Sequence, residues 1–122
     1  MGATSRLAEV QLEYFQVEDL GQEFVVTWKA RVEEDVYAYE LTRRTALSNE
    51  QFIKVFAPEA HGTEKVYTFH DDQVYKSSSE QLDYRLEVVY TNGLREVISS
   101  KSINYTSTAI RRTWGSLKAM FQ

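Results

Sequence analysis

Acidic and histidine side chains gather at two places in this chain of 122 residues. The run His70-Asp71-Asp72 has the residue types of a metal site or an acid–base pair, and the run Glu33-Glu34-Asp35 offers carboxylate oxygens to calcium. Neither run has the spacing of a dedicated metal loop. The only other histidine is His61, and the chain contains no cysteine. We therefore interpret both runs as solvated turns at strand ends.

Other constellations that carry chemistry are missing from the sequence. No serine lies in a Gly-x-Ser-x-Gly elbow, and no glycine-rich loop could hold a phosphate. The sequence therefore predicts a protein that is not an enzyme, with no catalytic residues, no metal site and no cofactor.

Composition and charge exclude further classes of protein function. Hydrophobic residues make up 43% of the chain, including 8 Tyr, 6 Phe and 2 Trp, which suits the core of one domain. The net charge of −4 argues against binding to nucleic acid, because neutralising phosphates needs basic patches. No run approaches the roughly 20 apolar residues that cross a membrane, and the first residues lack the apolar core of a signal peptide. If Met1 is the natural start, we expect a cytoplasmic protein.

Short runs of β-branched and aromatic residues separated by turn signals predict an all-β fold. We expect about seven strands, at residues 10–14, 24–30, 37–43, 52–56, 66–69, 82–90 and 94–105. Asn92-Gly93 predicts a two-residue hairpin turn between the last two strands, because both turn positions favour positive φ. Alternation predicts two inward faces: Phe24, Val26, Trp28 and Ala30 on one strand, and Tyr37, Tyr39 and Leu41 on the next.

The order of these residues resembles that of a fibronectin type III domain. That family places a core Trp on its second strand, where Trp28 stands, and a Tyr-x-hydrophobic pair on its third, matched by Tyr39 and Leu41. Its tyrosine corner near the start of the penultimate strand is matched by Tyr84. The resemblance covers residues 8–105 and implies a seven-strand fibronectin type III or immunoglobulin-like sandwich. Small bacterial proteins with this body and an Arg-Arg-Thr-Trp-Gly-Ser tail are similar over the whole chain.

The resemblance does not extend to integrin-type adhesion, because the loop between the last two strands carries Asn92-Gly93 and no Arg-Gly-Asp. In such a sandwich alternate loops lie at opposite poles. We therefore expect the run 33–35 to share one pole with Asn92-Gly93, and the acidic pairs 18–19 and 71–72 to share the other.

The last 17 residues differ from the body. We divide the chain into an N-terminal arm (1–7), the sandwich (8–105) and a cationic amphipathic tail (106–122). The tail carries +3 with no acidic residue, so the rest of the chain carries −7. Its pattern predicts a short helix with an apolar stripe, and we name as candidate contact residues Ile110, Arg111, Arg112, Trp114, Leu117 and Phe121.

Three surfaces could cover the apolar stripe of the tail. The protein's own sandwich is the first, with Arg111 or Arg112 pairing with the nearby acidic pole. A groove on another protein is the second, and copies of the same chain would then form a homo-oligomer. An anionic membrane is the weakest, because the acidic body would be repelled.

We expect a non-catalytic interaction or assembly module whose tail docks on a neighbouring subunit or another protein. The alternative is a module that binds a carbohydrate or peptide with the loops at the Asn92-Gly93 pole, with the tail packed on its own domain.

Overall fold

The computed structural model describes residues 8–45, 51–74 and 81–105, which form seven strands and no helix. The strands are β1 (Glu9–Asp19), β2 (Phe24–Glu34), β3 (Val36–Arg44), β4 (Ile53–Phe56), β5 (Tyr67–Asp71), β6 (Gln81–Tyr90) and β7 (Arg95–Asn104). The all-β prediction is confirmed. In the part of the chain that is described, nothing helical has the length and hydropathy to cross a membrane.

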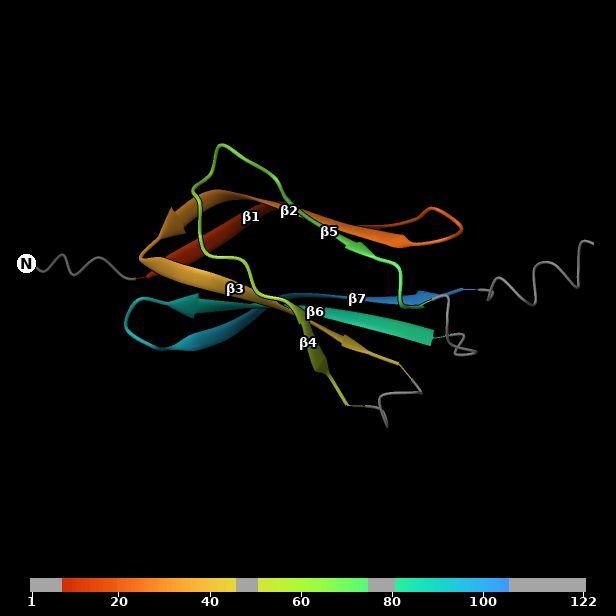
Figure 1. Cartoon of the computed structure of the whole chain (residues 1–122). Helices are drawn as coiled ribbons and strands as arrows, with labels where there is room; N and C mark the ends of the chain where they lie inside the picture. Colours follow the sequence, from red (N-terminus) through yellow and green to blue (C-terminus); the bar gives the residue numbers. More distant parts are fainter. Residues whose placement is uncertain (1–7, 46–50, 75–80, 106–122) are drawn as a thin grey trace, which may run out of the picture.

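The strands form two antiparallel sheets that pack face to face as a sandwich (Figure 1). One sheet has three strands in the order β1-β2-β5, and the other has four in the order β4-β3-β6-β7. The connection from β4 to β5, green in Figure 1, crosses from one layer to the other. Residues 58–60 of this connection run beside β3, where Tyr39 N donates to Pro58 O at 3.0 Å.

The core lies between the sheets and is rich in aromatic rings. Trp28 of β2 is fully buried and stacks on Tyr67 of β5, with ring centroids 5.1 Å apart. Tyr39 of β3 meets both rings edge-on. The predicted inward face of β2 is confirmed, since its members are at most 1% exposed: Phe24, Val26, Trp28 and Ala30.

The predicted inward face of β3 is wrong at its first member. Tyr39 and Leu41 are fully buried, but Tyr37 is 62% exposed. The pairing of β3 with β6 shifts register between Val36 and Ala38. A bulge of this kind inserts a residue and interrupts the alternation of side chains. Tyr37 therefore faces solvent although it stands two residues before a core tyrosine.

The turn between β6 and β7 is also different from the predicted two-residue hairpin. Gly93 N donates to Tyr90 O, and Tyr90 N donates to Leu94 O, so the loop spans three residues, 91–93. Among the described residues only Asp35 is a non-glycine with positive φ, so Asn92 keeps negative φ and Gly93 alone takes the left-handed conformation, at 87°. Asn92 Oδ1 accepts a hydrogen bond from Leu94 N and stabilises this form.

The predicted sharing of poles is confirmed at one end, where Thr91 N donates to Asp35 O at 2.8 Å. At the other end Phe24, which opens β2, pairs with Asp71, which closes β5. The N-terminal arm and the predicted tail helix lie outside the described residues.

Candidate functional site

The outer face of the four-stranded sheet carries polar side chains from three adjacent strands. Because directly paired residues of an antiparallel sheet point to the same side, the register groups them. Arg44 of β3 pairs with Asp83 of β6, which pairs with Ser102 of β7. Two residues further along β6, Arg85 pairs with Ser100 of β7. The core residues alternate with these, so the polar set points away from the three-stranded sheet.

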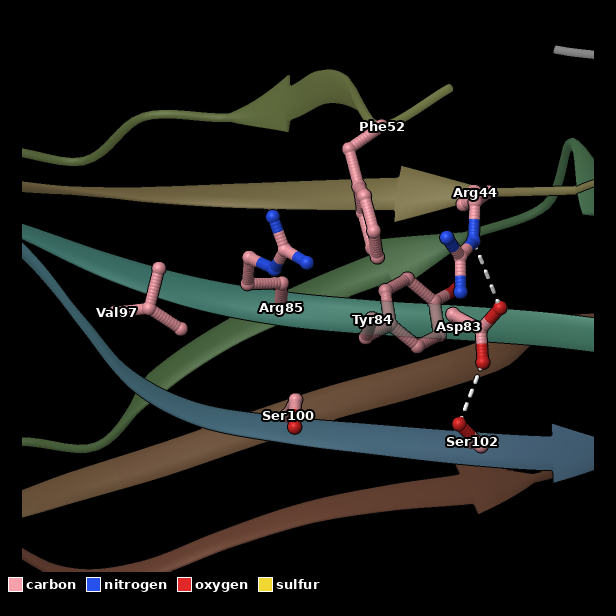
Figure 2. A pocket seen from close by; sticks show the side chains of 8 residues that line it. All are labelled: Arg44, Phe52, Asp83, Tyr84, Arg85, Val97, Ser100 and Ser102. Carbon is pink, nitrogen blue, oxygen red and sulfur yellow. Dashed lines mark hydrogen bonds and ion pairs between the residues drawn. The ribbon is translucent and has the colours of Figure 1, made fainter. Parts of the chain in front are cut away.

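This face is hollowed between β4 and β7, and Figure 2 shows the hollow at close range. Its volume is about 450 Å³. We call it the arginine hollow, and its lining residues are Arg44, Phe52, Asp83, Tyr84, Arg85, Val97, Ser100 and Ser102.

Phe52, just before β4, stands between two guanidinium groups (Figure 2). The guanidinium carbon of Arg85 lies 3.9 Å from the centroid of its ring, and that of Arg44 lies 4.6 Å from it. A guanidinium above an aromatic face is held by cation–π attraction and by planar stacking. The ring therefore fixes the planes of both arginines.

The two arginines differ in their hydrogen bonds. Arg44 Nε donates to Asp83 Oδ2 at 3.0 Å, and the other oxygen of Asp83 accepts from the Ser102 hydroxyl. Arg85 is the one described arginine whose guanidinium donates to no acceptor among the described residues. Its donors are thus available in a half-buried position on the sheet.

A second charged cluster lies beside the hollow on the same face. The guanidinium of Arg95 reaches Glu40 Oε1 at 3.0 Å and Glu87 Oε1 at 2.9 Å. The hydrogen bond from Arg95 lowers the pKa of Glu40, because it favours the ionised carboxylate. Lys54 adds a longer contact of 4.0 Å to Glu40. These charges compensate one another, in contrast to Arg85.

Binding is the chemistry that the arginine hollow suits. A planar guanidinium with open donors can hold a carboxylate through two parallel hydrogen bonds. Arginine and aromatic residues are also the types enriched at protein interfaces. The hollow offers hydroxyl groups from Ser100 and Ser102 on one side and the apolar side chain of Val97, which is 47% exposed, at its edge.

The structure corrects our interpretation of the run 70–72 as a solvated turn. Asp71 is the last residue of β5, is 1% exposed and lies between the sheets. Arg43 Nη1 lies 2.7 Å from both of its oxygens, and Tyr84 donates its hydroxyl to Oδ2 at 2.6 Å. Burial, followed by the nearby Asp71 charge, raises the pKa of Tyr84. The predicted tyrosine corner residue thus ties β6 to a buried ion pair.

The run 33–35 is likewise more than a solvated acidic turn. Glu33 Oε2 accepts hydrogen bonds from the hydroxyls of Tyr39 and Tyr67, at 2.8 and 2.9 Å. Its other oxygen accepts from Gly62 N at 2.8 Å. Burial is the main cause that raises the pKa of both tyrosines, and the Glu33 carboxylate adds to it. Glu33 therefore anchors the loop that carries His61, whose ring stacks on Tyr67 at 3.6 Å.

The predicted contact residues of the tail lie outside the described residues: Ile110, Arg111, Arg112, Trp114, Leu117 and Phe121. At the Asn92-Gly93 pole two apolar side chains are exposed, Tyr37 at 62% and Leu94 at 66%. Sequence reasoning did not find the arginine hollow. Strand alternation could have placed Arg85 on the outer face, but only the register brings it beside Phe52 and Ser100.

Within the ranges described, no three His, Cys, Asp or Glu side chains are placed to hold a metal ion together. Comparison with known proteins finds no matching family model, curated protein or solved structure.

Proposed function

We propose that residues 8–105 form a fibronectin type III domain. The pairing of the fourth strand supports this assignment. In immunoglobulin constant domains the fourth strand joins the sheet of the first, second and fifth strands. Here β4 pairs with β3, in the sheet that also holds β6 and β7. The buried Trp28 on β2 and Tyr84 on β6 stand where the family resemblance expects them.

We propose that this domain is a non-catalytic protein-interaction or assembly module. The observation that carries the proposal is the arginine hollow, in which Phe52 orders two guanidinium groups on an outer sheet face. Interface energy concentrates in a few arginine and aromatic side chains that are already held in place.

The hydrogen-bonded carboxylates of Asp71, which is buried, and Glu33, which is partly buried, support a structural role for these two acidic residues. Asp71 and Glu33 each accept hydrogen bonds from two or more packed groups. The donors to both carboxylates come from strands of the two sheets and, for Glu33, also from the loop that carries Gly62. These residues act as anchors that keep the sheets and the 57–66 loop in position.

We propose the cationic tail as a second contact. Its net charge of +3 is opposite to the −7 of the rest of the chain, so attraction between the tail of one copy and the body of another is favourable. Ile110, Trp114, Leu117 and Phe121 would supply the apolar contacts of this docking, with Arg111 and Arg112 beside them.

Photo-crosslinking tests the outer face as an interface. A benzoylphenylalanine at Val97, on the edge of the hollow, is compared with one at Thr68, which is exposed on β5 of the other sheet. In cells of the source organism we expect a discrete crosslinked product from position 97 and none from position 68. No product at position 97, or the same product at both positions, would contradict the proposal.

The exposed Tyr37 and Leu94 favour a second candidate function, binding of a carbohydrate or peptide at the Asn92-Gly93 pole. An exposed aromatic ring is a stacking surface for a sugar or a proline. A glycan and peptide array separates the two functions. If the pole is the site, Tyr37→Ala abolishes the array signal and removal of residues 106–122 leaves it intact.

A further inference from the structure

Arg85 is held ready for a ligand that the described residues do not supply. Its guanidinium lies 3.9 Å from the centroid of Phe52, which fixes its plane. Its cross-strand neighbours are Thr42 and Ser100, both polar and uncharged. A half-buried guanidinium with unused donors gains more from a charged acceptor than one in open water, because the local dielectric constant is lower.

The charge in the arginine hollow selects the ligand. Arg44 and Asp83 form an ion pair, so their charges compensate each other. Arg85 then contributes one uncompensated positive charge. A single negative charge matches it, whereas a phosphate dianion or a nucleic acid would add repulsion from a protein of net charge −4.

The residues that line the arginine hollow also favour a ligand with an apolar group beside its carboxylate. Phe52 borders the guanidinium on one side, and Val97 lies at the other edge of the hollow (Figure 2). The hydroxyls of Ser100 and Ser102 line the floor along β7. A carboxylate that reaches Arg85 therefore brings its neighbouring groups against apolar carbon.

We propose that the arginine hollow binds a segment of a partner protein that carries a single acidic side chain, with its Glu or Asp carboxylate paired to the Arg85 guanidinium and an adjacent apolar side chain against Val97. This inference rests on the proposed interaction function and names the partner's chemistry. Phe52 is the positioning residue, and Arg85 makes the charged contact.

Titration of the ¹⁵N-labelled full chain by NMR tests the proposal. The probe is the peptide acetyl-Ser-Glu-Leu-Ser-amide, and the matched neutral probe carries Gln in place of Glu. We expect saturable shifts of the Arg85 Nε–H and Ser100 N–H signals with the Glu probe. Charge-assisted hydrogen bonds predict that the Gln probe binds about tenfold more weakly. Equal affinity of the two probes would overturn the proposal.

Variants of single residues test whether binding of the Glu probe depends on the Arg85 side chain. Arg85→Gln is expected to weaken the Glu probe by about tenfold, since it removes the charge and the fork of donors. Phe52→Leu keeps an apolar side chain but releases the guanidinium, so it should weaken binding to a smaller extent. Arg95→Gln is the control, because Arg95 does not line the hollow and is held by Glu40 and Glu87. Unchanged binding by Arg85→Gln, or an equal loss with Arg95→Gln, would overturn the assignment.

A phosphoserine probe of the same length separates a monoanion from a dianion. Tighter binding of this probe than of the Glu probe would overturn the charge argument. The crosslinking result remains separate: a product from position 97 without carboxylate binding would leave the interaction function standing and remove this inference alone.

Discussion

Single side chains hold the two sheets together at defined atoms. The ion pair of Arg43 with Asp71 joins β3 to β5, and Tyr84 adds a hydrogen bond from β6. Glu33 performs a similar task near the other pole, where two tyrosine hydroxyls and a loop amide converge on it. A buried carboxylate such as Asp71 stabilises the fold only while its partners are present.

Asp71→Asn is expected to lower the free energy of unfolding by about 3 kcal/mol, because it leaves the buried Arg43 charge without a partner. Asp72→Asn is the matched control, since Asp72 is exposed, and should change stability by less than about 0.5 kcal/mol. Urea denaturation measures both variants. Similar losses in the two would show that Asp71 contributes no more than a surface carboxylate.

Buried tyrosines predict a loss of stability in alkali. Burial, with a hydrogen bond to Glu96, raises the pKa of Tyr90 to about 12, and burial also raises the pKa of Tyr39, Tyr67 and Tyr84. The unfolded chain releases these protons near the ordinary tyrosine pKa of about 10, while the folded protein keeps them. The stabilisation is therefore complete below pH 10 and is lost as the pH rises toward 12. Urea midpoints at pH 9 and 11 measure this, and Tyr90→Phe should reduce the difference between them.

At the scale of the element, irregular pairing decides which side chains a strand buries. The register shift in β3 turns Tyr37 outward, while Tyr39 enters the aromatic core. The pairing of β1 with β2 shifts register on both sides of Leu12, and β1 continues to Asp19, well past the predicted end at residue 14. Phe15 and Val17 pack against the core and account for the extra length.

The two tyrosines of β3 give a matched test of the bulge. Tyr39→Ala is expected to cost about 3–5 kcal/mol, because it empties a core site and leaves Glu33 with one donor fewer. Tyr37→Ala should cost less than about 0.5 kcal/mol. Thermal or urea unfolding compares them. A large loss from Tyr37→Ala would mean that this ring is packed in solution.

At the scale of the whole molecule, the last described residue, Tyr105, packs against the sandwich. Tyr105 is 6% exposed, meets Phe24 edge-on at 5.4 Å, and donates its hydroxyl to Val74 O at 3.4 Å. The chain therefore keeps its core contacts up to Tyr105. A chain that ends at Tyr105 therefore retains the contacts of this residue with Phe24 and Val74.

Light scattering over a range of concentrations compares the full chain with residues 1–105. We expect the mass of the full chain to rise with concentration and the truncated chain to stay a folded monomer, because the cationic tail docks on the acidic body of a neighbour. If the full chain and the truncated chain are both monomers at every concentration, self-assembly through the tail is contradicted. A lower melting temperature of the truncated chain would then place the tail on its own domain, and equal melting temperatures would point to another protein as its partner.

The sequence by itself determined the all-β class, the inward face of β2 and the sharing of one pole by residues 33–35 and Asn92-Gly93. Side-chain alternation and turn preference are local properties, so they can be read along the chain.

Only the tertiary structure decided the bulge that exposes Tyr37, the burial of Asp71 and the placement of Phe52 between Arg44 and Arg85. Each depends on which residues pair across neighbouring strands, and a shift of one position changes those partners while leaving the local pattern unchanged. The arginine hollow is assembled from β3, β6, β7 and the residue before β4. Its chemistry exists only once their registers are set.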